Sequence, residues 1–316
     1  MLKLKTKILM SGFLLLMLPS ISHSNDLIFA VKSSDIEPYN LALKGAQEVF
    51  KAKGVGSIVK VYDIKGDAFI WKDVLKDIKE ERPKVIMTFG TVATELVMKD
   101  VRDTPIVFST VLNPEESGIV NSLASPGGNV TGASLDIPVE TQFSYILNMV
   151  PAVKKVGVLY NPKETGLIVE RARATASRMQ IQLIARPVNS ETDLPMAIDT
   201  LFRQVDVLWS VADSTVFSLP AIQKIIVETI RYKVPFMGIS PSFVKAGSLF
   251  SVKWDDMDIG RQAGEAVVKI ISGRANISDI PVASPREVSV SINARTASTI
   301  GLTIPDKILK RAEVFK

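Results

Sequence analysis

Short apolar runs alternate with segments of helical spacing along most of the chain. Continuous apolar runs between amphipathic helices are typical of parallel strands buried on both faces, so the pattern predicts an α/β fold. The predicted strands are 27–31, 58–62, 85–89, 106–110, 155–160, 181–187, 205–211 and 234–238. The predicted helices are 39–53, 68–79, 92–99, 139–149, 165–179, 219–232 and 256–272.

The strands and helices form two series, which indicates two similar Rossmann-like lobes. A Ser-Pro-Gly-Gly-Asn stretch at 125–129 separates them and is either a turn before a crossing strand or an ordinary surface loop. The second series is longer, which fits a chain that returns to the first lobe near Trp254 and then crosses back. We therefore predict a signal peptide at 1–24, a first lobe from 25–132 plus 254–285, and a second lobe from 133–253 plus 286–316.

The N-terminal segment has the pattern of an export signal. Lys3, Lys5 and Lys7 precede an apolar run at 8–18, and small residues follow up to Ser24. The run is shorter than the roughly 20 residues that span a bilayer. We expect cleavage near Asn25 and a periplasmic protein, with an uncleaved membrane anchor as the alternative.

The residue inventory excludes several kinds of chemistry. The chain has no cysteine, and its single histidine, His23, lies in the segment predicted to be removed. Disulfides, His- or Cys-ligated metals and a Ser-His-Asp triad are excluded, and we expect no cofactor and no metal. The three lysines of 1–24 account for three of the five net positive charges, leaving +2, so we expect no nucleic-acid partner.

Candidate ligand-binding residues follow the strands of the first series, because ligands of α/β sheets bind beyond the carboxyl ends of the strands. They are Ser34 and Tyr39 after the first strand, Gly90 and Thr91 after the third, and Thr110 after the fourth. The helix start at Gly90-Thr91 offers free N–H groups to a carboxylate. Simple helix capping is the alternative.

The second series supplies the facing candidates. Asn161 ends one strand, Asp213 and Ser214 end another, and Trp254 and Asp255 follow the strand at 247–252. Asp213 would pair with a ligand amine, or else cap a turn or helix. Trp254 would stack on the ligand, or else pack in the hinge.

Several of these segments resemble one family, the ABC-transporter substrate-binding proteins of the tryptophan/tyrosine type. The similarity covers essentially the whole predicted mature chain and is most specific at Ser-Leu-Ala-Ser-Pro-Gly-Gly-Asn-Val-Thr-Gly (122–132) and at 296–305, within INARTASTIGLTIPDKILKRAEV. FGTVATEL and VPAVKKVGVLYNPKE also match. The resemblance implies a type I periplasmic-binding fold, with two lobes joined by three crossing strands and a ligand in the cleft.

Within the resemblance, Gly90 and Thr91 match the family's helix start, Asp213 and Ser214 match a usual Asp-Asn pair, and Asp255 matches an Asp or Asn after the last crossing strand. Two segments at the expected cleft depart from the family pattern. They are 251–253, Ser-Val-Lys here in place of Ser-Tyr-Gly, and the loop 33–39. We predict a small zwitterion or amino-acid-like solute, bound between the Gly90-Thr91 helix start and Asp213.

The sequence is consistent with three functions. The protein captures a small solute for a membrane permease, reports the same solute to a membrane sensor, or uses Asp213 with Asp255 as an enzyme. We predict a binding protein rather than an enzyme, monomeric, which closes on its ligand by a hinge motion and delivers it to an ABC permease. Sensing is the retained alternative.

Overall fold

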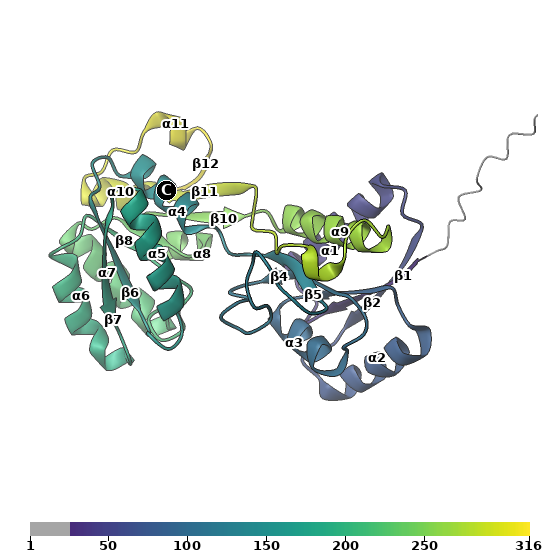
Figure 1. Cartoon of the computed structure of the whole chain (residues 1–316). Coiled ribbons are helices and arrows are strands. Elements are labelled where there is room, and N and C mark those ends of the chain that lie inside the picture. Colours follow the sequence, from purple (N-terminus) through teal and green to yellow (C-terminus); the bar gives the residue numbers. More distant parts are fainter. Residues whose placement is uncertain (1–25) are drawn as a thin grey trace, which may run out of the picture.

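A computed structural model describes residues 26–316, which form two α/β lobes side by side (Figure 1). The first lobe contains a sheet of order β2-β1-β3-β4-β5, and the second a sheet of order β12-β11-β10-β9-β8-β6-β7. The strand pairs are parallel except for β10 with β11. The predicted fold class is confirmed.

Helices cover both faces of the first sheet, as its apolar strands require. In β1, Ile28 and Ala30 pack against α1 and α9, whereas Phe29 and Val31 face α2 and α3. The elements of this lobe are β1 (Asp26–Lys32), α1 (Glu37–Ala52), β2 (Ser57–Asp63), α2 (Ala68–Glu81), β3 (Val85–Phe89), α3 (Thr91–Asp100), β4 (Ile106–Val111), β5 (Val130–Ser134) and α9 (Asp256–Ile271).

The second sheet is covered in the same way. Val156 and Val158 of β6 join the core under α4, α5 and α10, and Leu159 joins the core under α6 and α7. The elements are α4 (Val139–Met149), β6 (Lys155–Tyr160), α5 (Gly166–Arg178), β7 (Gln182–Pro187), α6 (Leu194–Phe202), β8 (Val207–Trp209), α7 (Leu219–Tyr232), β9 (Phe236–Gly238), α8 (Pro241–Ala246), β10 (Phe250–Trp254), β11 (Val288–Asn293), α10 (Ala294–Ile300), α11 (Asp306–Leu309) and β12 (Ala312–Phe315).

The chain passes between the lobes three times: after β5, after β10, and between α9 and β11. The third passage is tied to the first lobe by Arg286, whose guanidinium donates to the buried Asp258 carboxylate at 2.8–3.0 Å and to Glu265. Burial of one partner makes this pair stronger than a surface ion pair. The third passage is therefore held to the first lobe up to Arg286.

Helix α9 returns to the first lobe by packing closely on α1. A β-carbon added at Gly260 would lie 1.8 Å from the carbonyl oxygen of Ala42, and one added at Gly45 would lie 2.0 Å from that of Met257. Gly264 meets Ala46 in the same way, at 2.9 Å from its α-carbon. The two backbones are thus closer than any larger residue permits.

Some elements differ from the sequence predictions. The strand after the 125–129 turn does not cross between lobes but pairs with β4 as the edge strand β5, and the crossing follows at 135–138. The structure adds α6, α8, α10, α11, β11 and β12, which the pattern does not predict. The predicted lobe boundary at 132/133 lies within β5, and the predicted signal peptide lies outside the described residues. No helix of residues 26–316 is long and apolar enough to cross a membrane.

We predict that Gly260→Ala destabilises the protein by roughly 1–3 kcal/mol, because the added methyl group meets backbone that cannot move aside. Urea unfolding followed by circular dichroism measures the change. Gly166→Ala is the matched control, since an added β-carbon at this helical position has no neighbour within 4 Å. Equal stability of the two variants would show that α1 and α9 separate at little cost.

Candidate functional site

A cleft between the lobes contains two adjoining cavities, of about 270 Å³ and about 400 Å³. Residues of both lobes and of the crossing segments line each of them. We call the smaller one the Asp136 cavity and the larger one the Tyr39 cavity. The walls that the two cavities share are apolar and consist of Leu112, Leu135, Ile239 and Trp254.

The start of α3 forms one side of the Tyr39 cavity. The Ser33 hydroxyl accepts a hydrogen bond from the backbone N–H of Ala93 at 2.9 Å and donates to the Phe89 carbonyl at 3.0 Å, so it caps the helix. The ring hydroxyl of Tyr39 lies against Gly90, where a β-carbon would be 2.3 Å away. Gly90 also has φ +89°, a conformation that favours glycine. Burial raises the pKa of Tyr39, while a hydrogen bond with Ser33 opposes the change.

Thr110, at the end of β4, is held in a strained conformation. It has φ +57°, which is unusual for a β-branched residue, and it sits where the pairing of β4 with β5 shifts register. Its hydroxyl donates to the carbonyl of Ser109 at 2.6 Å. Strained backbone is common at binding sites, and Thr110 and Thr91 both line the Tyr39 cavity.

Trp254 ends β10 at the second crossing and lines both cavities. Its indole N–H donates to the Asp256 carboxylate at 2.9 Å, which fixes the ring at the centre of the cleft. Burial raises the pKa of Asp256, and this hydrogen bond opposes the change. The neighbouring Asp255 accepts from the backbone N–H groups of Met257 and Asp258 and caps α9.

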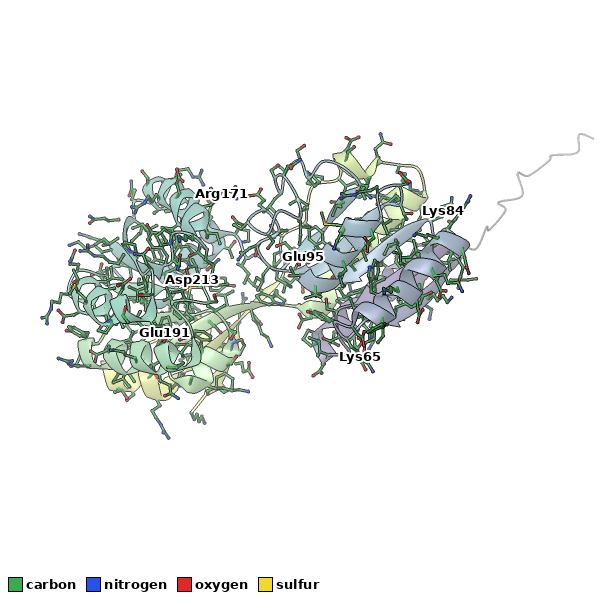
Figure 2. All side chains as sticks on the ribbon, turned by 90° about the horizontal axis from the view of Figure 1, so that it is seen from below. Lys65, Lys84, Glu95, Arg171, Glu191 and Asp213 are labelled. Atoms are coloured by element: carbon green, nitrogen blue, oxygen red, sulfur yellow. The ribbon has the colours of Figure 1, made fainter. Side chains whose placement is uncertain are left out.

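The remaining second-lobe candidates form a separate cluster. The buried Asp213 carboxylate accepts four hydrogen bonds, from the Asn161 and Val216 N–H groups at 2.6 and 2.9 Å, the Thr165 hydroxyl at 2.6 Å and one further backbone N–H at 3.1 Å. Ser214 is bound to Glu164. This is the arrangement of the turn-capping alternative, and neither cavity is lined by these residues. Figure 2 shows Asp213 within the second lobe.

Ser34 belongs to the loop after β1 but lines neither cavity. This loop is held by Lys32, whose ammonium group donates to Asp35 at 2.6 Å and to Asn40 at 2.8 Å. Of the predicted residues, the structure therefore brings Tyr39, Thr91, Thr110 and Trp254 together around one cavity, with Gly90 directly beneath Tyr39.

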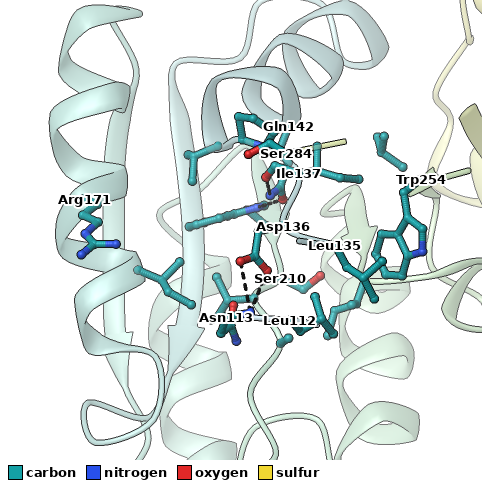
Figure 3. A pocket seen from close by; sticks show the side chains of 18 of the residues that line it. Leu112, Asn113, Leu135, Asp136, Ile137, Gln142, Arg171, Ser210, Trp254 and Ser284 are labelled. Carbon is teal, nitrogen blue, oxygen red and sulfur yellow. Dashed lines mark hydrogen bonds between the residues drawn. The ribbon is translucent and has the colours of Figure 1, made fainter. Parts of the chain in front are cut away.

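Apart from Trp254, the residues that line the Asp136 cavity are not among those predicted from the sequence (Figure 3). Asp136 lies on the first crossing segment, and both of its oxygens accept from the backbone N–H of Asn113, at 2.9 and 3.1 Å. Burial, with Glu116 and Glu115 nearby, raises the pKa of Asp136 to about 6. An acidic residue in an otherwise apolar segment directly before a helix was the available signal for it.

An ion pair crosses the cleft at the Asp136 cavity. Arg171 of α5 binds Glu115 and lies 3.6 Å from Glu116, and both glutamates belong to the loop after β4. Figure 2 shows Arg171 at the side of the second lobe that faces the first. Glu115 is fixed by the N–H of Leu123 at 2.6 Å. This ion pair joins the two lobes outside the crossing segments.

Comparison with known proteins supports the resemblance seen in the sequence. The tyrosine-binding protein of Clostridioides difficile (strain R20291) is 25% identical over 268 residues, 83% of this chain and 76% of that protein. The crystal structure of an ABC domain in complex with L-Trp from Streptococcus pneumonia is 25% identical, with a TM-score of 0.62 over 92% of this chain and 99% of that one.

A third comparison concerns the fold alone. The ligand-free, open structure of a substrate-binding protein with adhesive properties from Clostridium difficile is 20% identical, with a TM-score of 0.76 over 92% of this chain and 99% of that one. The family model described as ABC transporter substrate binding protein matches residues 37–316, which include most of the first lobe and all of the second. The chain belongs to the family of ABC transporter substrate-binding proteins.

Proposed function

We propose that the protein is exported to the periplasm, captures an amino acid in the cleft between its lobes and presents it to the permease of an ABC importer. It acts as a monomer and releases the amino acid chemically unchanged. The family supports solute binding, and the names of two relatives, a tyrosine-binding protein and a domain in complex with L-Trp, support an amino acid as the solute.

The observation that carries the proposal is the set of polar groups around the Tyr39 cavity. Lys253 supplies a positive charge and Asp256 a negative one, and Thr91 is the first residue of α3, whose Ala93 N–H is already bonded to Ser33. A zwitterion has a carboxylate and an ammonium group on neighbouring atoms. The carboxylate suits Lys253 and the start of α3, and the ammonium group suits Asp256.

Lys253 departs from the sequence pattern of the resembling family. It stands in the Ser251–Lys253 stretch, where the resembling family commonly has Ser-Tyr-Gly, and both Val252 and Lys253 line cavities of the cleft. The chain therefore replaces an aromatic side chain and a glycine with a smaller apolar side chain and a cation. The amino group of Lys253 provides the charge that a carboxylate requires.

The shared apolar walls receive the side chain of the amino acid. Leu112 and Leu135 come from the first lobe and the first crossing, Ile239 from the second lobe, and Trp254 from the second crossing. Because these groups come from different parts of the chain, rotation of one lobe against the other brings them together around the ligand. Binding then favours the closed arrangement.

Export predicts a defined N-terminus. Protein isolated from the periplasm should begin at or near Asn25, because the pattern of residues 1–24 places the cleavage site there. Edman sequencing or intact mass measurement reads the N-terminus directly. Full-length protein confined to the cytosol would contradict the proposed location.

We predict that Trp254→Ala weakens amino-acid binding by about 10- to 100-fold, because roughly 1.5–3 kcal/mol of apolar contact is lost from the centre of the cleft. Mass spectrometry of the ligand that co-purifies with natively extracted protein identifies the amino acid, and isothermal titration calorimetry measures the affinity of each variant.

Phe69→Ala is the control for this substitution. Phe69 is a strongly exposed aromatic residue on α2 that lines neither cavity, so its loss should leave affinity unchanged. If Trp254→Ala bound the amino acid with wild-type affinity, the cleft would not be the binding site. A co-purified ligand with no amino-acid headgroup, or one that the protein converts chemically, would overturn the function itself.

A further inference from the structure

The Asp136 cavity contains an acidic group that the proposed recognition of a zwitterion does not use. Asp136 is half-buried between Leu135 and Ile137, on the segment that crosses from β5 to α4. The cavity adjoins the Tyr39 cavity through the shared apolar walls. A side chain that leaves the zwitterion site past Trp254 therefore enters the Asp136 cavity.

No basic side chain is paired with Asp136 in the described part of the chain. Its carboxylate accepts from the N–H of Asn113, which is shared between its two oxygens, and makes a hydrogen bond with the Ser134 side chain, so both of its partners are neutral. The charged groups that line the same cavity are Glu115, Glu116 and Arg171, and Arg171 is engaged by the two glutamates. Three carboxylates thus face one guanidinium, and a partly buried negative charge at Asp136 is left without a cation.

Asp213, a buried aspartate with a structural role in the same protein, provides a comparison for Asp136. Its oxygens accept four hydrogen bonds from its own lobe. Asp136 has two hydrogen-bond partners, the Asn113 N–H and the Ser134 side chain, faces a cavity and lies on the first crossing segment. A partly buried carboxylate with so little compensation is costly, and burial holds its pKa near 6. An additional positive group in the cavity would offset that cost.

We propose that Asp136 is the specificity-determining residue for a cationic group at the far end of the ligand, so that the amino acid bound is one with a basic side chain. This inference rests on the proposed function, because the zwitterion of the same molecule occupies the Tyr39 cavity. The methylene groups of such a side chain lie along Leu112, Leu135 and Trp254, and its terminal ammonium group reaches the Asp136 carboxylate.

L-Lysine and L-norleucine provide the matched pair of probes, since norleucine has a side chain of the same number of carbons and lacks the terminal amine. We expect wild-type protein to bind lysine at least about tenfold more tightly than norleucine, since the amine gains a charge-assisted contact in a largely apolar cavity. Asp136→Asn should abolish this preference and leave norleucine binding nearly unchanged. Calorimetry with both amino acids and both proteins measures the four affinities.

Glu170→Gln is the control for charge, because Glu170 precedes Arg171 on α5, is exposed and does not line the cavity. It removes the same charge as Asp136→Asn and should keep the preference for lysine. Ligand-free Asp136→Asn should unfold at no lower temperature than wild type at pH 7, since it removes a carboxylate whose charge is disfavoured by burial. The wild-type comparison of lysine with norleucine stands even if the variant does not fold.

The pH dependence tests the same contact. The folded protein takes up a proton at Asp136 near pH 6, so its carboxylate is charged at pH 7 and largely neutral at pH 5. The preference for lysine should therefore be present above about pH 6 and fall by about tenfold between pH 7 and pH 5. Glu115, Glu116 and Arg171 face the same cavity, so the comparison uses Asp136→Asn, in which this fall should be absent.

The outcomes separate the two proposals. Equal binding of lysine and norleucine by wild type, or a preference for lysine that persists in Asp136→Asn, overturns the role of Asp136 and leaves amino-acid capture standing. If lysine, norleucine and L-tyrosine all fail to bind and the co-purified ligand is not an amino acid, the proposed function fails and this inference fails with it.

Discussion

The close backbone contact between α1 and α9 is the constraint on which the architecture depends. Helix α9 comes late in the chain, after most of the second lobe is complete, yet Gly260 and Gly45 allow it to pack on the first helix of the first lobe. A chain that returns in this way has to leave again to form β11. Three passages between the lobes follow, and a cleft flanked by connecting strands follows from them.

The connecting segments also carry much of the chemistry of the cleft. Trp254 stands at the start of the second passage and lines both cavities, and Asp136 lies on the first passage. Two hydrogen bonds, each 2.7 Å long, tie the first passage to the second lobe (Figure 3). The Trp209 indole donates to the Gln142 side chain, and Gln142 donates to the Ile137 carbonyl. Groups on a passage move less than groups on the lobe tips during a rotation. They can thus contact a ligand before and after closure.

The sequence predicts the long elements well, because the buried apolar positions of a long helix or strand recur at a regular spacing along the chain. Helix 256–272 and the strand 85–89 agree with α9 and β3 within one residue. Short elements such as α8 and β12 have too few residues to show a period, and their formation depends on partners distant in sequence. β5 is a case of this kind, since its place as an edge strand is set by pairing with β4.

Only part of the site could be predicted from the sequence. The rule that ligands bind beyond strand ends brings Tyr39, Thr91 and Thr110 to one cavity, because it depends on topology alone. The same rule also selects Asp213, and no sequence pattern shows that four donors from its own lobe surround it. Asp136 is missed for the converse reason, since it follows a strand that the pattern treats as a crossing. Hydrogen-bond saturation is a property of three-dimensional packing.

The ion pair of Arg171 with Glu115 has a consequence for the surroundings in which the protein works. Arg171 is 52% exposed, whereas Glu115 is 9% exposed, so the solvent reaches the pair from one side. Dissolved ions screen such a contact, over about 10 Å at 0.1 M salt and about 3 Å at 1 M. The strength with which this ion pair holds the two lobes together therefore falls as the ionic strength of the medium rises.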